Sequence, residues 1–309
     1  MSSSNQLVEI GSLPQGKYHA IDFVNENQGW VVGDGGAIFH TTNGGKTWLK
    51  QASGTTDDLM RVQFVDEDFG WVAGTRAILH TENGGLSWTK QLSDSSQSKF
   101  VCMCFVNRFR GWVRGPSVGT IYRTVNGGAQ WEVQQIGESI GVTDISFVNE
   151  NVGYVLLGIS RICKTTDGGN QWNKISGPRF PFSICFLSEQ TGFIGNDINA
   201  SSLMNDRASI FRTDDGGNTW SEQTIPKTAT VWKIAFANSE KGWALAGGFT
   251  ERELLLYTTN GGQIWNQIEN RPANTQFVDF AVLDEIDVWV LGSSGQIFKI
   301  NFCGCSIGD

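Results

Sequence analysis

The sequence predicts an all-β chain that folds as a seven-bladed β-propeller, in which each blade is a four-stranded antiparallel sheet. Three observations lead to this fold class. A turn motif that ends in tryptophan occurs six times, at intervals of 40 to 48 residues. A second pattern, an apolar residue followed two positions later by phenylalanine, recurs seven times in register with it. No segment shows the apolar periodicity of a helix. Repeats at this spacing are typical of propellers and solenoids.

The turn motif reads Thr-x-Asn/Asp-Gly-Gly-x-x-Trp, and we expect it to join the third and fourth strands of a blade, here lettered c and d in chain order a to d. Asn-Gly and Asp-Gly supply the positive-φ residues that tight hairpin turns require. The Asn/Asp position is held by Asn43, Asn83, Asn126, Asp167, Asp215 and Asn260. The closing tryptophans are Trp48, Trp88, Trp131, Trp172, Trp220 and Trp265.

We assign these motif residues a structural role rather than a chemical one. The Asn or Asp side chain can accept hydrogen bonds from nearby backbone N–H groups and so shape the turn. The tryptophan is expected to be buried between strands, where it would remove about 200 Å² from water. At about 25 cal/mol per Å², such burial stabilises each blade by several kcal/mol as an upper estimate.

The apolar-x-Phe pattern predicts strand a, because alternation with a period of two is typical of a half-buried strand. An aromatic residue follows each copy, usually after a glycine, and marks strand b. The strand a pairs are Ile21/Phe23, Val62/Phe64, Met103/Phe105, Ile145/Phe147, Ile184/Phe186, Ile234/Phe236 and Val278/Phe280. The strand b aromatics are Trp30, Trp71, Trp112, Tyr154, Phe193, Trp243 and Trp289.

The seventh repeat is incomplete, and the N-terminus is predicted to complete it. This repeat stops after strand c, at 296–301, and has no turn motif. Residues 7–11 precede the first blade as 49–51 precede the second. An outer strand from the N-terminus would leave no blade with an open edge. We expect one domain over 1–309, with blades at 19–51, 61–91, 101–135, 142–175, 182–223, 231–268 and 277–302 plus 5–10.

Composition excludes several function classes. The formal net charge of −8 argues against nucleic-acid binding, which needs a basic surface to neutralise phosphates. No apolar run approaches the roughly 20 residues of a membrane span. The start, Met-Ser-Ser-Ser, lacks the basic and apolar regions of a signal peptide. We expect no metal and no cofactor, because the three histidines and six cysteines do not show metal-ligand spacing. The disulfide state of Cys303 and Cys305 stays open.

The candidate binding residues are arginines on one face of the predicted propeller. The b–c hairpins and d–a links share this face, and function on rigid scaffolds is usually carried by loops. Five successive b–c hairpins carry an arginine, namely Arg76, Arg114, Arg161, Arg207 and Arg252. The d–a links add Arg61, Arg179 and Arg271, and Trp232 follows another of these links. Arginine suits the recognition of carboxylates and protein partners. The alternative is ordinary solvated loops, because acidic residues such as Asp57 lie on the same face.

The turn motif is the Asp-box, or BNR repeat, and its combination with Phe-Val-x-x-x-x-Gly-Trp-x-x-Gly resembles the photosystem II stability/assembly factor family. The segments 23–33 and 64–74 carry the resemblance best, together with Gly74-Thr75-Arg76-Ala77. The resemblance implies a seven-bladed propeller without catalytic activity that binds assembly intermediates of membrane proteins, partly through an arginine patch. Arg76 matches the family motif directly, whereas the residues flanking Arg114 and Arg161 depart from it.

A carbohydrate-binding or glycoside-hydrolysing Asp-box propeller is the alternative. Asp22 and Asp279 are inner-strand acids on adjoining blades and Asp144 is a third, and two carboxylates can hydrolyse a glycoside. Their simpler reading is hydrogen bonding between blades. A sialidase would need a tyrosine nucleophile, and of the four tyrosines only Tyr18 lies near an inner loop.

We therefore expect a monomeric, non-enzymatic protein-binding scaffold, an assembly or stability factor whose partner presents an acidic segment. The resemblance favours a periplasmic, lumenal or secreted location.

Overall fold

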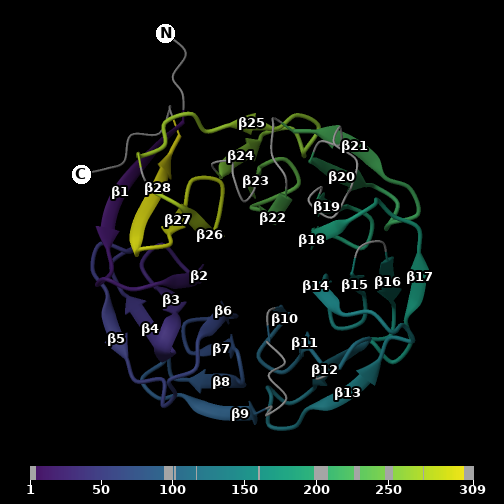
Figure 1. The fold of residues 1–309 in the computed structure, drawn as a ribbon, viewed down its shortest axis with the longest axis horizontal. Helices are drawn as coiled ribbons and strands as arrows, with labels where there is room; N and C mark the ends of the chain where they lie inside the picture. The colour runs from purple at the N-terminus through teal and green to yellow at the C-terminus, as the bar shows by residue number, and fades with distance from the viewer. Residues whose placement is uncertain are drawn as a thin grey trace.

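The computed structural model describes residues 5–93, 100, 102–115, 117–158, 161–197, 208–225, 230–247, 253–273 and 275–302. Its strands form seven four-stranded antiparallel sheets, arranged as blades around a central opening (Figure 1). The predicted fold class is confirmed. Within the described residues the only helical element is a single 3-10 turn, η1 (Asp34–Gly36), in the b–c hairpin of blade 1.

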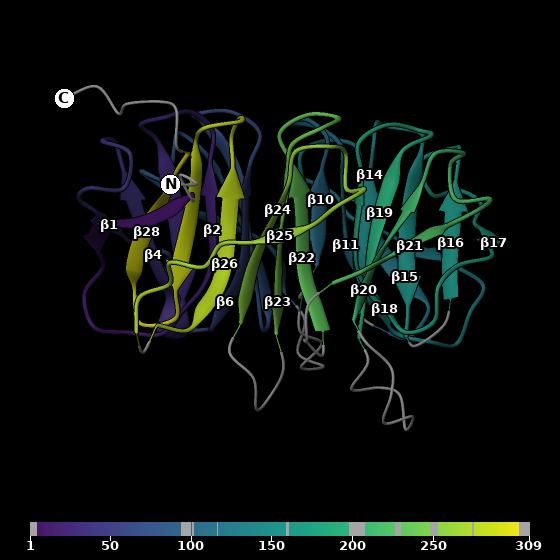
Figure 2. The same cartoon turned by 90° about the horizontal axis from the view of Figure 1, so that it is seen from above.

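The first strand of each blade lies nearest the propeller axis, and the fourth lies at the rim (Figure 1). Seen from the side, most strands run roughly along the axis (Figure 2). The a strands are β2 (Tyr18–Phe23), β6 (Leu59–Phe64), β10 (Met103–Phe105), β14 (Val142–Phe147), β18 (Pro181–Phe186), β22 (Thr230–Phe236) and β26 (Phe277–Val282). The b strands are β3 (Gly29–Gly33), β7 (Phe69–Gly74), β11 (Gly111–Arg114), β15 (Gly153–Leu157), β19 (Gly192–Asn196), β23 (Gly242–Gly247) and β27 (Val288–Gly292).

The outer two strands of each blade flank the Asp-box turn. The c strands are β4 (Ala37–Thr41), β8 (Ala77–Glu82), β12 (Thr120–Thr124), β16 (Arg161–Thr165), β20 (Ser209–Thr213), β24 (Leu254–Thr258) and β28 (Gln296–Asn301). The d strands are β5 (Leu49–Gln51), β9 (Thr89–Ser93), β13 (Glu132–Gln135), β17 (Asn173–Ile175), β21 (Ser221–Thr224), β25 (Asn266–Gln267) and, for blade 7, β1 (Gln6–Ser12).

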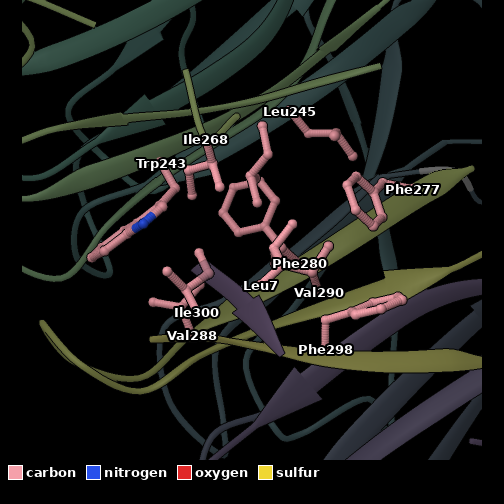
Figure 3. Packing of buried hydrophobic residues seen from close by; sticks show 11 residues of the cluster. Leu7, Trp243, Leu245, Ile268, Phe277, Phe280, Val288, Val290, Phe298 and Ile300 are labelled. Atoms are coloured by element: carbon pink, nitrogen blue, oxygen red, sulfur yellow. The ribbon is translucent and has the colours of Figure 1, made fainter. Parts of the chain in front are cut away.

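The N-terminal strand closes the ring, as predicted. β1 lies antiparallel to β28, with Gln6 opposite Asn301 and Ser12 opposite Gln296, so the last sheet has the order β1-β28-β27-β26. Leu7 on β1 is buried in one hydrophobic cluster with residues of blades 6 and 7, as Figure 3 shows. Two ends of the chain thus share one sheet and one core.

Neighbouring blades are held together by stacked aromatic rings. The phenylalanine that ends strand a of one blade stacks on the strand b aromatic of the preceding blade; Phe105, for example, lies 3.8 Å from Trp71 between ring centroids. The Asp-box tryptophan of the same blade then meets this phenylalanine edge-on, as Trp131 does at 6.1 Å. The other stacked pairs are Trp30/Phe64, Trp112/Phe147, Tyr154/Phe186, Phe193/Phe236 and Trp289/Phe23.

The Asp-box tryptophans are less buried than the sequence suggested. Trp265 is buried, with 8% of its surface exposed, and the other five are partly exposed. Full burial belongs to the strand b tryptophans, namely Trp30, Trp71, Trp112, Trp243 and Trp289. The expectation that each Asp-box tryptophan is buried between strands is therefore wrong for five of the six.

The predicted register of strand a in blade 7 is also wrong, by two residues. Trp289 pairs with Ala281, as Trp30 pairs with Asp22, so Val282 rather than Phe280 takes the place of Phe23. Phe280 points instead into the cluster that blades 6 and 7 share, and it is fully buried (Figure 3). No helix among the residues described is long and apolar enough to cross a membrane.

Candidate functional site

The Asp-box turns satisfy their own polar groups, which supports the structural role assigned to them. In the first copy, the amide of Thr47 donates to Asn43 Oδ1 at 2.9 Å and the amide of Gly45 donates to Thr41 Oγ1 at 3.0 Å. The copies with aspartate make the same bonds. Asp215 accepts from both the hydroxyl and the amide of Thr219, and these bonds lower its pKa to about 2. The hydrogen bonds of these side chains are made within the turn itself.

The arginines of the b–c hairpins occupy three different environments. Arg76 has a side chain that is 63% exposed, and its Nε lies 3.3 Å from a carboxylate oxygen of Asp57. Arg161 begins β16 and pairs with Glu138. Arg114 ends β11, is partly buried, and takes part in none of the ion pairs found among the described residues. Arg207 and Arg252 lie outside the described residues.

The arginines of the d–a links differ as much in their surroundings. The assignment of Arg61 to a link is wrong: it lies within strand β6 and lines the central channel. Arg179 is exposed. Arg271 is enclosed: its Nη2 lies 2.5 Å from a carboxylate oxygen of Glu253, and Nη1 donates to the carbonyl of that residue at 2.6 Å. Arg271 therefore holds the loops of blade 6 rather than facing a ligand.

The central channel forms a cavity of about 570 Å³ between the a strands. Charged side chains from different blades line it: Asp22, Arg61, Asp144, Lys233 and Asp279. The Nζ of Lys233 donates to Asp279 Oδ1 at 2.6 Å, and the other oxygen of Asp279 accepts from the amide of Ile21 at 3.0 Å. Partly exposed apolar residues, among them Phe182 and Trp232, lie along the same cavity.

Each channel carboxylate is bonded to the backbone of the next blade. Asp22 accepts from the amide of Phe64 at 2.6 Å, and Asp144 accepts from that of Ile184 at 2.9 Å. Desolvation by the surrounding strands raises the pKa of Asp22 to about 7 and that of Asp144 to about 6, against the effect of these hydrogen bonds. Gln63 and Ser146 make the equivalent inter-blade bonds without a charge. This arrangement supports the structural reading of the acids over the glycoside-hydrolase reading.

Sequence reasoning missed Lys233 and Phe182 as channel residues. The reference is the strand a site that holds Asp, Gln, Cys or Ser in most blades. Lys233 lies two residues before this site in its blade, and Phe182 lies three residues before it. These positions face the axis, so a comparison of them across the blades would have found both residues. Within the described residues no group of three His, Cys, Asp or Glu side chains could hold a metal ion. Four cysteines, Cys102, Cys104, Cys163 and Cys185, are free thiols; Cys303 and Cys305 lie outside the described part of the chain.

Seven four-stranded blades and six Asp-boxes define the class of protein as a seven-bladed Asp-box propeller. The family model for "Photosynthesis system II assembly factor YCF48" matches residues 4–143. A second model, for sortilin and neurotensin receptor 3, matches residues 160–288. The predicted resemblance to the photosystem II stability/assembly factor family is confirmed.

Curated relatives bear the same family name. Photosystem II assembly lipoprotein Ycf48 of Synechococcus sp. (strain CC9902) is 26% identical over 306 residues, which are 90% of this chain and 83% of the relative. Photosystem II assembly protein Ycf48 of Synechococcus sp. (strain JA-3-3Ab) is 26% identical over 193 residues, 59% of this chain and 53% of the relative. The chain thus spans about half the length of the second relative.

Solved structures share the fold. "YCF48 bound to D1 peptide" matches with a TM-score of 0.74 and 17% identity, over 98% of both chains. YCF48 from Cyanidioschyzon merolae matches with a TM-score of 0.74 and 18% identity, over 96% of this chain and 98% of that one. A GH74 xyloglucanase from Xanthomonas campestris matches with a TM-score of 0.72 and 13% identity, over 98% of this chain and 55% of the enzyme. At these identities the likeness concerns the fold alone.

Proposed function

We propose that the protein is a non-enzymatic scaffold that binds a protein partner, as an assembly or stability factor of a larger protein complex. The names of the curated relatives, both photosystem II assembly proteins, support this role. So does the structural neighbour named as bound to a D1 peptide, which is an example of a peptide bound to this fold.

The binding surface is the face formed by the b–c hairpins and d–a links. The observation that carries this proposal is the placement of Arg76, Arg114 and Arg161 on the b–c hairpins of three successive blades, 2, 3 and 4. Arg61, on strand β6 of blade 2, and Arg114 of blade 3 both lie within electrostatic range of the buried Cys102 thiol. Guanidinium groups on neighbouring blades can bind several carboxylates of one acidic segment.

The acidic neighbours of these arginines are compatible with such binding. The pair between Arg76 and Asp57 involves an arginine that is mostly in water, and exposed ion pairs stabilise a protein by about 0–1 kcal/mol. A carboxylate of a partner can therefore replace Asp57 at little cost. Arg114, which has no ion pair within the described chain, offers its charge without such an exchange.

The test is capture of the partner from cells that produce the protein, with the full chain as bait and cross-linking before purification. We expect the variant Arg76→Glu/Arg114→Glu/Arg161→Glu to lose the partner that the unmodified chain retains. The matched control, Lys46→Glu/Lys90→Glu/Lys174→Glu, has the same charge change at exposed positions on or beside the Asp-box turns and should retain it. Capture should also weaken as salt rises, because exposed charges are screened beyond about 8–10 Å at physiological ionic strength.

Arg114 is partly buried, so the thermal unfolding of each variant is measured alongside. Arg76→Glu alone, at the most exposed of the three positions, separates binding from folding. Equal capture by the triple variant and the control, with both folded, would remove the arginine face from the proposal. Hydrolysis of a glycoside that depends on Asp22 or Asp279 would replace the scaffold by an enzyme.

A further inference from the structure

Four peptide bonds of this chain join an asparagine to a glycine, and all of them lie in Asp-box turns. They follow Asn43, Asn83, Asn126 and Asn260, and each of these asparagines is exposed to solvent. Asparagine is among the chemically labile side chains, and a following glycine has no Cβ to shield its backbone nitrogen. These four bonds are therefore the places where the chain is most open to deamidation.

Deamidation begins with an attack by the glycine on the asparagine before it. The backbone nitrogen of the glycine gives up its proton and bonds to Cγ, the carbonyl carbon of the side chain. The bond from Cγ to the side-chain nitrogen breaks, and this nitrogen leaves with the proton as ammonia. A five-membered succinimide remains, and water opens it at one of its two carbonyls to give aspartate or isoaspartate. Water is the only co-reactant, and nothing is oxidised or reduced.

The Asp-box turn keeps the two reacting groups apart. In blade 1 the amide of Gly44 donates to the carbonyl of Asn27 at 2.9 Å, and Asn43 Oδ1 accepts from the amide of Thr47 at 2.9 Å. The attack needs the glycine nitrogen without its proton and the asparagine side chain rotated onto it, so both bonds have to break first. The other three Asn-Gly turns make the same two bonds. This protection is therefore common to all four.

The four turns differ in what holds the side-chain nitrogen, Nδ2, of the asparagine. In blade 1 it donates to Thr47 Oγ1 at 2.8 Å, and in blade 2 to Ser87 Oγ at 2.9 Å. In blade 3 the contact to Gln130 Oε1 is long, at 3.4 Å. In blade 6 this place is taken by Ile264, which has no acceptor, and Asn260 Nδ2 has no partner among the described residues. One hydrogen bond fewer thus holds this side chain than in blades 1 and 2.

The hairpin that carries Asn260 also has the shortest outer strand of the four. β25, at the rim of blade 6 (Figure 1), has two residues, which pair with Leu256 and Tyr257 of β24. One further backbone bond follows, from Ile268 to Leu255. In blades 2 and 3 four residues of the outer strand pair with strand c, and in blade 1 three do. A short ladder favours local opening, which the attack requires.

We propose that Asn260 is the deamidation site of this protein, converted in the folded chain to aspartate and isoaspartate faster than the other three asparagines. The expected order follows the partner of Nδ2: Asn260 reacts first, Asn126 with its long contact next, and Asn43 and Asn83 last. One ordinary hydrogen bond changes an equilibrium by roughly two- to tenfold, and this sets the expected difference in rate. The site lies on the Asp-box face, and the proposal does not rest on the proposed function.

The two products differ in how well they fit the turn. Aspartate fits, because Asp167 holds the same place in blade 4 and accepts from the amide of Gln171 at 2.9 Å and the hydroxyl of Thr165 at 2.8 Å. Isoaspartate lengthens the main chain of the turn by one carbon and shortens the side chain, so the bonds now made to Asn260 Oδ1 should be lost. Both products add a negative charge, and isoaspartate also loosens the hairpin of blade 6.

The experiment follows all four asparagines in the full chain, kept folded in mildly alkaline buffer at physiological temperature for several weeks. Peptide mapping by mass spectrometry measures the mass gained when each amide becomes an acid. The sharpest comparison is Asn260 with Asn43, because both lie in the sequence Thr-Thr-Asn-Gly-Gly. Asn260 should react roughly two- to tenfold faster in the folded chain. In guanidinium chloride, where the turns are unfolded, the two should react at the same rate.

An exchange of residues between these two turns tests the cause. Ile264→Thr gives Asn260 the hydroxyl that Asn43 has, and should slow its deamidation. Thr47→Ile takes that hydroxyl from Asn43, and should accelerate its deamidation. Each change in rate should be roughly two- to tenfold. Both substituted positions are exposed, and the thermal unfolding of each variant verifies that it is folded.

Two results would overturn the proposal. One is a folded chain in which any of the other three asparagines reacts as fast as Asn260. The other is a folded Ile264→Thr variant in which Asn260 reacts at its original rate, because the missing hydrogen bond would then not be what exposes this site.

Discussion

Val282 and Val288 face each other in blade 7, at the position where each of the other six blades pairs a phenylalanine with a glycine. The glycine is required there because the phenylalanine ring lies over it: a Cβ added to Gly70 would stand 2.4 Å from the ring of Phe64. In blade 7 the smaller Val282 leaves room for a side chain at 288. In blade 7 the phenylalanine has thus been replaced by a smaller residue and the glycine by a larger one.

This exchange predicts strong coupling between Phe64 and Gly70 in blade 2. Gly70→Val should destabilise the protein by about 1–3 kcal/mol or more, through overpacking against the ring. Phe64→Val loses the stack on Trp30 and should cost a similar amount. The double variant should lose less free energy of unfolding than the two single variants lose together, and the difference should be about 0.5–3 kcal/mol. Denaturant unfolding of the four proteins measures this, and strict additivity would contradict the packing account.

Removal of residues 1–11 should lower the free energy of unfolding by several kcal/mol. The deletion leaves β28 as an open edge and takes Leu7 out of its cluster, and a total stability of about 5–15 kcal/mol is typical of a domain. The melting temperature measures the effect. A deleted chain that melts like the whole protein would mean that β1 adds nothing to the closure.

Two tryptophan variants in blade 2 separate the two aromatic positions. Trp71→Ala should cost about 3–5 kcal/mol, because Trp71 is fully buried, stacks on Phe105 and donates to the carbonyl of Gly127. Trp88→Ala should cost less, about 1–3 kcal/mol, because this Asp-box ring is partly exposed and less of it is removed from water. Chemical denaturation measures the loss of stability in both variants. A larger loss in Trp88→Ala than in Trp71→Ala would mean that the Asp-box tryptophan is the main anchor of the blade, as first expected.

The channel acid Asp22 should make stability fall as pH rises from about 4 to about 7. Its pKa is raised from 3.8 to about 7 in the folded protein, so in this range the folded state holds a proton that the unfolded state has lost. Unfolding therefore releases this proton, so a rising pH favours the unfolded state, and the stabilisation that is fully present below about pH 4 is lost as the pH rises through about 7. Asp22→Asn should flatten this part of the curve, measured as denaturation midpoints at successive pH values. An unchanged slope would show that Asp22 is ionised at neutral pH.

Most of the fold could be predicted because its signals are local and repeated. The seven copies of the strand a pattern predicted the blade count, and the missing seventh Asp-box predicted the closure by residues 5–10. The register of blade 7 failed for a specific reason: Phe280 imitates the strand a phenylalanine, whereas Val282 holds that place, and only the pairing of Ala281 with Trp289 reveals it.

The candidate sites were less accessible to sequence reasoning because their parts come from blades far apart in the chain. Lys233 and Asp279, for example, come from the a strands of neighbouring blades and are 46 residues apart in the chain. The arginines of the b–c hairpins could be named in advance, but their neighbours could not. Only the structure shows that Arg161 pairs with Glu138 and that Arg114 pairs with no described carboxylate.

The pairing of β1 with β28 also sets the order of events during synthesis. Gln6–Ser12 is made before all the other strands of the ring, and its partner Gln296–Asn301 is made after all of them. At about 5–20 residues per second, the first strand waits roughly 15–60 s for its partner. Until then the nascent chain is an open arc with Leu7 uncovered at one end and an unfinished blade at the other. The ring can close only after β28 has been made, and the time until then is when this protein is most open to wrong pairing with another chain.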